Sequence, residues 1–233
     1  MHNRYHLLWG LSVTLSMISI TKVEAQLIPD NTLGKEKSIV NSVDLLQKID
    51  GGAIRGSNLF HSFKEFNIDN GKSVYFSNPN TIQNILTRVT GKNPSSIFGK
   101  LGVLGNANLF LINPNGIIFG KNASLDISGS FSATTSSSIL FDNGFEFSAT
   151  NLQAPPLLKI NITPGLQYPR SQQGDISSQA NLTVGNDLNL IGKNINLTGN
   201  LRAGRDLNLT AENNLQIRDS SEIPFIADAT NNL

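Results

Sequence analysis

The sequence predicts an all-β protein whose strands wind into a three-sided β-solenoid behind an N-terminal cap. One observation is a repeat of 19 or 20 residues within residues 174–218, in which aliphatic residues return in three registers. A second is that short runs rich in β-branched and aromatic residues alternate with turn residues from Gly51 onward, while no useful stretch has the 3.6-residue period of an amphipathic helix. Solenoids of this kind usually act as binding surfaces.

The repeats predict how side chains stack. The clearest match is between residues 185–190 and 204–209, which read Gly-Asn-Asp-Leu-Asn-Leu and Gly-Arg-Asp-Leu-Asn-Leu. Strand alternation should point Leu and Ile inward and Asn and Gln outward. Equivalent residues then lie about 4.8 Å apart along the axis, with Leu on Leu and Asn on Asn. The three aliphatic registers are Ile176, Ile195 and Leu215; Leu182 and Leu201; and Leu188 and Leu207.

Turn and strand signals order the rest of the chain. Residues 26–45 form a lead-in segment, and we expect one helical turn at Asp44–Lys48. Short strands are expected at residues 74–76, 109–112, 117–119, 131–134, 139–141 and 145–147. Four dipeptides supply the positive φ angles that tight turns require, namely Asp50–Gly51, Asn70–Gly71, Asn115–Gly116 and Asn143–Gly144.

A proline-rich stretch separates two styles of strand. Four of the nine prolines fall between Pro155 and Pro169, after the irregular aromatic strands and before the regular Leu- and Asn-rich ones. We interpret this as a change of style within one continuous stack, with a flexible linker as the alternative. Residues 157–162 still have the pattern of a strand.

The first 25 residues have the pattern of a secretory signal peptide. A polar start with Arg4 precedes the apolar run Leu7–Ile20, and Val23–Ala25 fits a small-x-small cleavage site. The run is short and rich in hydroxyl residues, so a transmembrane helix is the weaker alternative. Cleavage leaves 208 residues with 16 basic and 16 acidic side chains and no second apolar run of spanning length. This balance argues against binding to nucleic acid, and we expect no stable membrane insertion.

An ordered set of short motifs then resembles a known family. They are Pro29–Gly34, Asn78–Asn80, Arg88–Gly91, Asn113–Ile117, Gly120–Ala123 and Gly129–Thr135. Behind a signal peptide, this set is similar to the two-partner secretion domain, or haemagglutination activity domain, of filamentous haemagglutinin-type exoproteins, and the opening motif resembles the cyanobacterial members. The resemblance spans roughly residues 27–165.

The resemblance implies a right-handed parallel β-helix that serves as an export address. In such proteins a dedicated outer-membrane β-barrel transporter with POTRA domains recognises the domain in the periplasm of a Gram-negative-type bacterium. The product is then secreted or displayed at the cell surface, where an adhesin would meet a host or glycan ligand. The expected division is a signal peptide at 1–25, the secretion domain at 26–165 and β-helix repeats at 166–233. Because residues 218–233 lack a polar capping element, we expect a longer stack, with a stand-alone copy as the alternative.

By similarity, two Asn-Pro-Asn motifs are the candidates for transporter recognition. Proline fixes φ, asparagine bonds its own backbone and glycine accepts positive φ, so each motif also suits a tight corner. The two roles are compatible. Thr81 stands where many members carry leucine, which leaves the role of the first motif open. The candidate residues are Asn78, Pro79, Asn80, Asn113, Pro114, Asn115, Gly116 and Ile117.

A β-helix carbohydrate-active enzyme is the rival hypothesis. It would need a carboxylate cluster, and Asp187 and Asp206 are one repeat apart. We expect each of them instead to follow a turn glycine and bond local backbone. His61 is the one histidine outside the signal peptide, and we expect a surface or cap position for it. The sequence therefore gives no catalytic, cofactor-binding or metal-binding residues. Three glycines, Gly99, Gly102 and Gly105, are expected in turns.

Overall fold

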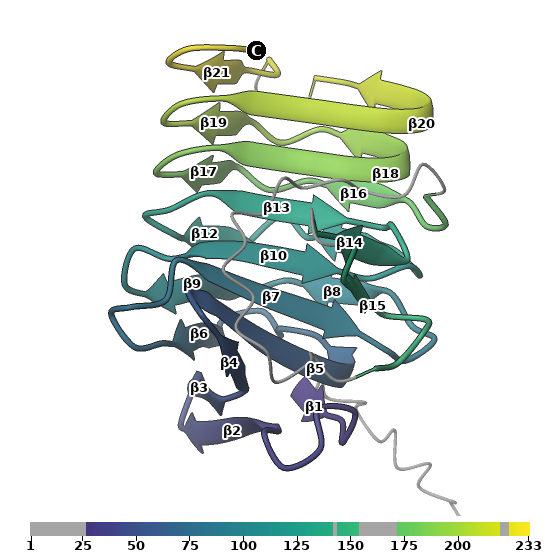
Figure 1. Cartoon of the computed structure of the whole chain (residues 1–233). Helices are drawn as coiled ribbons and strands as arrows, with labels where there is room; N and C mark the ends of the chain where they lie inside the picture. Colours follow the sequence, from purple (N-terminus) through teal and green to yellow (C-terminus); the bar gives the residue numbers. More distant parts are fainter. Residues whose placement is uncertain (1–26, 142–143, 154–171, 220–223) are drawn as a thin grey trace, which may run out of the picture.

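The computed structural model describes residues 27–141, 144–153, 172–219 and 224–233. All 21 regular elements in these residues are β-strands, which confirms the all-β prediction. The strands form a three-sided parallel β-helix (Figure 1). The front strands run from left to right, the chain returns behind them, and it climbs from the cap to the C-terminus, so the coil is right-handed (Figure 1).

Three sheet faces make up the coil. The first face contains the parallel strands β5 (Asn58–Phe66), β7 (Asn84–Val89), β10 (Asn108–Ile112) and β13 (Phe131–Thr134), continued by the first halves of β18 (Leu188–Leu197) and β20 (Leu207–Ile217). The second face contains β8 (Ser95–Ile97), β11 (Ile117–Phe119) and β16 (Ile176–Ser178), continued by the second halves of β18 and β20. The third face contains β3 (Leu46–Gly51), β6 (Ser73–Ser77), β9 (Lys100–Leu104) and β12 (Ser124–Asp126), followed by β17 (Leu182–Val184), β19 (Leu201–Ala203) and β21 (Ala227–Ala229).

The strand β18 joins two faces without a loop. Its start pairs with β13, Leu188 beside Phe131, and its end pairs with β16, Ile195 beside Ile176. Where it pairs with β20, the register shifts after Gly192, which lies at the bend between the two halves. The stack thus runs unbroken from β13 to β18, which confirms one continuous coil on both sides of the proline-rich stretch. The strand expected at 157–162 and the signal peptide lie outside the described residues.

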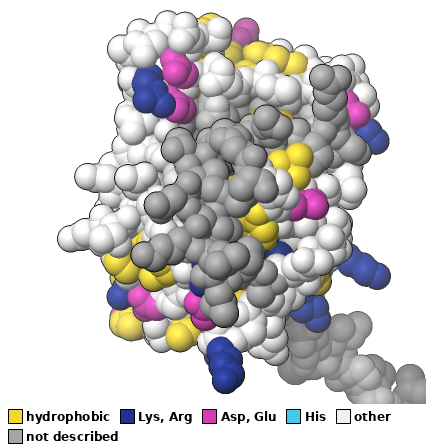
Figure 2. Space-filling model, in the orientation of Figure 1, with side chains coloured by type: hydrophobic (Ala, Val, Ile, Leu, Met, Phe, Trp, Pro, Cys, Tyr) yellow, Lys and Arg dark blue, Asp and Glu magenta, His cyan; other side chains and the backbone are white. Residues whose placement is uncertain are grey.

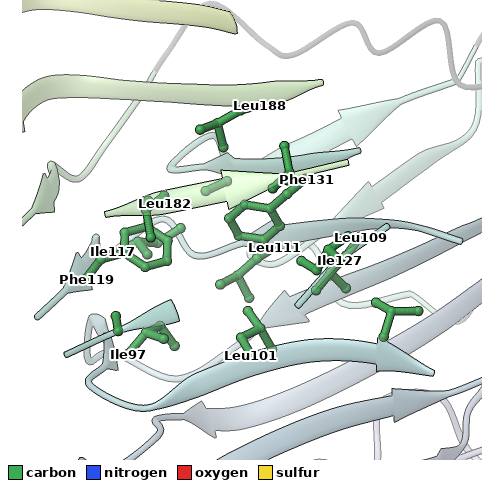
Figure 3. Close-up of a cluster of buried hydrophobic side chains, with 14 of the residues drawn as sticks. Ile97, Leu101, Leu109, Leu111, Ile117, Phe119, Ile127, Phe131, Leu182 and Leu188 are labelled. Carbon is green, nitrogen blue, oxygen red and sulfur yellow. The ribbon is translucent and has the colours of Figure 1, made fainter. Parts of the chain in front are cut away.

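Aliphatic side chains stack inside the coil as predicted. Leu188 lies beside Leu207, Leu182 beside Leu201 and Ile176 beside Ile195. Figure 3 shows side chains from all three faces pointing into one interior. Each fully buried Leu contributes about 2 kcal/mol, and every rung needs its neighbours to cover its apolar face. One inward column of the first face contains Leu59, Ile85, Leu109, Phe131, Leu188 and Leu207.

Asparagine ladders line parts of the outer surface, as expected. Asn208 donates from Nδ2 to Oδ1 of Asn189 at 2.9 Å, and Asn214 donates likewise to Asn194 at 3.1 Å. A third ladder marks the corner where the chain enters the first face. There Asn84 Nδ2 bonds Asn58 Oδ1, and Asn108 Nδ2 bonds Asn84 Oδ1, both at 3.0 Å. These side-chain bonds run parallel to the axis and reinforce the rung spacing.

The cap differs from one sequence prediction. The strands β2 (Ser38–Val43) and β3 form an antiparallel hairpin, so the helical turn expected at Asp44–Lys48 is wrong. Asp44 takes φ of 53° at the hairpin turn, a conformation that Asp tolerates better than most residues. The pairing of Val43 with Leu46 then extends the third sheet by one strand. The strand β1 (Leu27–Pro29) pairs antiparallel with β5 and completes the cap.

A second hydrophobic core lies outside the first face. The antiparallel hairpin β14 (Ser138–Leu140) and β15 (Glu146–Ser148) leaves the coil and folds over β7 and β10, while β4 (Ala53–Arg55) pairs with β5. The outward side chains Phe60, Leu86, Phe110 and Ile112 of β5, β7 and β10 are therefore buried. This cluster contains Leu33, Ala53, Phe60, Leu86, Phe110, Ile112, Ile139, Phe141, Phe147 and Ala149.

The predicted turn glycines are mostly confirmed. Gly51, Gly71, Gly116 and Gly144 all have positive φ. Gly102 is an exception, because it lies within β9 rather than in a turn. A Cβ at that position would clash with the ring of Tyr75, which packs across it and donates its hydroxyl to Asp126 Oδ2 at 2.6 Å.

Candidate functional site

The second Asn-Pro-Asn motif is a buried corner between β10 and β11. Asn113 is fully buried and donates from Nδ2 to Asn93 O and Ser95 Oγ, each at 3.0 Å. Its Oδ1 accepts the N–H of Asn115 at 3.0 Å. One side chain therefore closes its own turn and ties it to the rung below. The Gly116 N–H completes the corner with a 3.1 Å bond to Asn113 O.

Close backbone packing surrounds this second motif. Gly116 has φ of 119°, a conformation that only glycine adopts readily. Gly174 of the next rung lies directly against the motif, where a Cβ would come within 2.7 Å of Pro114 O. Pro114 is buried, while Asn115 is exposed and bonds Gly91 O of the rung below at 2.9 Å. Most of this motif therefore serves the coil, and Asn115 alone presents a polar side chain.

The first Asn-Pro-Asn motif is an exposed corner between β6 and β7. Pro79, Asn80 and Thr81 are exposed, and Asn78 is half-buried. The Ile82 N–H bonds Pro79 O at 3.0 Å and closes the turn. The corner borders a hollow of about 490 Å³ that is lined by Asn78, Asn80, Gln83, Gly105, Asn106 and Asn108.

The two motifs do not form one site. The first lies where the third face meets the first, and the second lies one rung on, where the first face meets the second. The structure confirms that both are corners. It also separates them by exposure, since the first offers free side chains and the second is largely buried.

The outer side of the first face holds a buried polar network that the sequence analysis did not single out. Arg88 is fully buried and donates from Nη2 to Thr32 Oγ1 at 2.8 Å, from Nε to Ser62 Oγ at 3.0 Å, and from Nη1 to Ser148 O at 2.7 Å. Its guanidinium also lies 4.6 Å from the centre of the Phe147 ring. One side chain thus joins the cap, the coil and the β14–β15 hairpin. An arginine among the apolar residues of β7 was the available sequence signal.

Asp30 balances the charge of Arg88. Its carboxylate accepts hydrogen bonds from Thr32 Oγ1 at 2.6 Å, Ser62 Oγ at 2.8 Å and Thr90 Oγ1 at 2.6 Å. Burial alone would raise the pKa of Asp30, but these hydrogen bonds outweigh it and hold the pKa below its ordinary value. Burial lowers the pKa of Arg88 to about 10, while Asp30 opposes that shift. Both groups are therefore charged at neutral pH, within hydrogen-bonding surroundings.

His61 lies against the cap and not at the surface, so of the two expected positions the surface is wrong and the cap is the one that the structure supports. Its side chain points into the coil beneath the cap strand β2, fully buried, with Nδ1 3.0 Å from Ser38 Oγ. Burial lowers the pKa of His61 to about 3, and the Asp50 charge opposes this only weakly. The ring is neutral at physiological pH and packs 5.2 Å from that of Phe76. Strand parity could have revealed the inward direction, because His61 is two residues from the inward Leu59.

The acidic pair one repeat apart is structural. Asp187 accepts both a hydrogen bond and an ion pair from Arg205, and also bonds Ser130 Oγ at 3.2 Å. Asp206 accepts Asn232 Nδ2 at 3.0 Å. Ladder partners, more than local backbone, therefore hold these carboxylates. Within the described residues, no group of three or more His, Cys, Asp or Glu side chains could hold a metal ion. The same residues contain no helix long and apolar enough to cross a membrane.

The coil and its motifs match one family along nearly the whole chain. The sequence profile of the TPS secretion domain matches residues 25–232. This chain belongs to the TPS secretion domain family. The match confirms the resemblance seen in the motifs, and the family's role is export of exoproteins by two-partner secretion. Because the family match reaches residue 232, it includes the regular Leu- and Asn-rich repeats as well as the earlier rungs with aromatic strands.

Relatives of this TPS secretion domain come from Haemophilus influenzae. The chain is 37% identical over 79 residues to a heme/hemopexin-binding protein of strain Rd, covering 34% of this chain and 8% of that protein. A second heme/hemopexin-binding protein is 29% identical over 119 residues, covering 51% of this chain and 12% of that protein. The TPS secretion domain thus corresponds to a small part of these curated relatives.

A solved structure supports the fold of the TPS secretion domain. The crystal structure of the HMW1 secretion domain from Haemophilus influenzae aligns with a TM-score of 0.51 and 25% sequence identity. The alignment covers 76% of this chain and 42% of that one. The parallel β-helix is therefore shared with a secretion domain, and the rival carbohydrate-active enzyme gains no support.

Proposed function

We propose that this chain directs an exoprotein to a dedicated outer-membrane transporter, whose POTRA domains and barrel receive it from the periplasm. Family membership supports this role, and the predicted signal peptide at 1–25 would deliver the chain there. The product is then secreted or held at the surface of a Gram-negative-type bacterium. Residues 26–165 carry the address, and residues 166–233 begin the β-helix repeats, from which an adhesin would reach host or glycan surfaces.

The exposure of the first corner is the observation that supports a recognition site. Asn80 and Thr81 are exposed and bond no described residue, so their polar groups are available to a partner. Both ends of the Asn113 amide, by contrast, are hydrogen-bonded within the coil. We therefore assign direct contact to the first corner together with Asn115. The second corner holds the shape of the rung that the transporter meets.

Secretion and stability assays separate these two roles. Asn80→Ala should reduce transporter-dependent secretion several-fold and leave the free energy of unfolding unchanged. Asn113→Ala should lower the free energy of unfolding by about 2–3 kcal/mol, because a buried amide loses several hydrogen bonds. Asn122→Ala is the matched control, since Asn122 is also an exposed asparagine but lies at a different corner, where it bonds Asn70 Oδ1 two rungs away. Normal secretion of Asn80→Ala, in cells that secrete nothing without the transporter, would contradict recognition at this corner.

Folding outside the cell is the proposed source of directionality. Each new rung buries apolar surface on the one before it, so folding can propagate from the cap and hold the exported chain outside. Asn189→Pro tests this, because Asn189 lies in β18 between two parallel partners and proline removes a ladder N–H. We expect surface appearance to slow several-fold. Unchanged export kinetics would rule out folding as the driving step.

The proposed role is non-enzymatic. Asp187 and Asp206, the pair one repeat apart that an enzyme could have used, are held by Arg205 and Asn232. A purified chain that cleaves pectin or another polysaccharide, with activity lost in Asp187→Asn, would restore the enzyme hypothesis.

A further inference from the structure

The second face carries a polar trough, one side of which reaches Asn115 and Gly116 of the second Asn-Pro-Asn corner. Three hollows of about 420, 420 and 510 Å³ adjoin one another there, and all three share Asn196. The midline of this axial trough consists of Ile118, Ser177, Asn196 and Gln216, which are register partners on β11, β16, β18 and β20. The trough therefore runs along the β-helix axis, one side chain per rung.

Unused hydrogen-bonding capacity distinguishes this midline. The side chains of Ser177, Asn196 and Gln216 form no hydrogen bond with any residue that the structure describes. Outward amides in the neighbouring columns do pair, as Asn189 does with Asn208 and Asn194 with Asn214. Carbonyl oxygens and amide N–H groups thus point into a hollowed surface, where a ligand can use them.

An aromatic side chain borders the same trough. Phe98 is 40% exposed and lines the first hollow. Its ring packs against the backbone of Gly120, where any Cβ would clash with it. Its backbone is fixed as well, since the Phe98 N–H bonds Ile68 O at 2.7 Å. The ring is therefore a rigid apolar platform beside the polar column.

Charge and strand pairing favour one class of occupant. The midline is neutral, and the nearest charges are Arg218 on one shoulder and Lys193 and Asp175 on the other. On the first face, which is turned toward the viewer, Figure 2 likewise shows basic and acidic side chains scattered rather than gathered in a patch. A polyanion would require concentrated positive charge. A peptide adding as a strand would require a free edge, but β11, β16 and β18 are paired on both sides. Among the described strands of the trough, β20 pairs with β18 alone, so its free edge lies at the end of the trough rather than along it.

We propose that the axial trough binds a neutral glycan chain laid along the axis. Sugar hydroxyls both donate and accept, which matches a column of amides and a hydroxyl. The apolar face of a sugar ring packs on an exposed aromatic ring such as Phe98. Rungs spaced about 4.8 Å apart offer one polar side chain at each step from Ser177 to Gln216, a distance close to the size of one sugar ring. The proposal rests on the adhesive role proposed above, and its test changes Phe98, Asn196 and Gln216 while leaving Asn115, which also belongs to the proposed transporter contact, as it is.

A printed glycan array with neutral and anionic members tests the proposal on the full secreted chain. We expect binding to neutral glycans, reduced at least tenfold in Phe98→Ala and in the double variant Asn196→Ala and Gln216→Ala. Asn208→Ala is the matched control, an outward amide on the first face that should leave binding unchanged. Unfolding curves of all variants confirm that the coil is intact.

Three outcomes would overturn the proposal. They are no binding to any neutral glycan, binding only to anionic glycans, and neutral-glycan binding that survives both trough variants. Secretion of the same variants is measured in parallel. If the trough variants lose transporter-dependent secretion while no neutral glycan binds, the trough is a protein interface instead. If Asn80→Ala secretes normally but neutral glycans bind as expected, the recognition corner fails and the trough stands.

Discussion

The aromatic rungs from β5 to β13 and the regular rungs from β16 to β21 build the same coil in different ways. One outward column of the first face shows the difference. It reads Phe60, Leu86 and Phe110 on β5, β7 and β10, becomes polar at Ser132 on β13, and continues as Asn189 and Asn208 on β18 and β20. The apolar part is covered by the β14–β15 hairpin, and the polar part forms ladders. Early rungs rely on unique contacts between distant segments, whereas late rungs repeat one small interaction.

Arg88→Ala should produce the largest loss of stability. It leaves the half-buried Asp30 carboxylate without its nearby positive charge and removes the hydrogen bonds that join the cap and the hairpin to β7. We expect a loss of about 4–5 kcal/mol in the free energy of unfolding, measured in urea. Arg205→Ala removes an exposed arginine of the regular rungs and should cause no measurable change. Equal effects from the two variants would abolish the contrast between the regions.

Acid should weaken the aromatic rungs through His61. The folded pKa is about 3 and the ordinary value about 6.5, so the unfolded chain binds more protons between these values. Stability should therefore fall as pH drops from about 6.5 to about 3, by on the order of 4 kcal/mol. The loss of stability attributable to Asp30 begins at lower pH. The charged carboxylate stabilises the fold fully above its ordinary pKa of about 3.9, and this stabilisation disappears as pH falls through the lowered pKa of the folded state.

His61→Leu isolates the histidine contribution. Urea unfolding at intervals from pH 7 to pH 4 should give a much flatter stability profile for this variant than for the wild type. A wild-type profile that is already flat across this range would contradict the buried, neutral ring.

Phe147→Ala tests whether the second core is a separate layer. It removes a buried ring that packs 4.9 Å from Phe60 and lies under the Arg88 guanidinium. We expect a loss of about 3 kcal/mol. Amide hydrogen exchange should accelerate in β14 and β15 while β18 and β20 keep their protection. Uniform acceleration along the coil would show one cooperative unit instead.

Single ladder contacts should have the smallest effect. Asn208→Ala breaks one exposed amide bond to Asn189 and should cost about 0.5–1 kcal/mol in the same urea experiment. A loss as large as that of Phe147→Ala would mean that the regular rungs also depend on unique contacts.

Periodicity explains why the regular rungs could be predicted so closely. A residue such as Leu207 meets the residue 19 positions earlier, so neighbours in space follow directly from the repeat. Turn glycines were also predictable, because positive φ is a local requirement that Gly51 and Gly71 meet without help from distant segments. The Asp44 turn failed because a short polar–apolar run fits a helical turn and a hairpin equally well, and only pairing with β6 selects the hairpin.

The sequence by itself determined the coil, its three faces and its corners, because those follow from strand alternation, repeat length and turn chemistry. The tertiary structure alone decided which motif is exposed, which partners surround His61 and Arg88, and that β14 and β15 leave the stack. The partners of Arg88, for example, include Thr32 and Gln153, which lie 56 and 65 residues from it along the chain. No local pattern encodes such contacts, since they form only when the rungs have already brought the segments together.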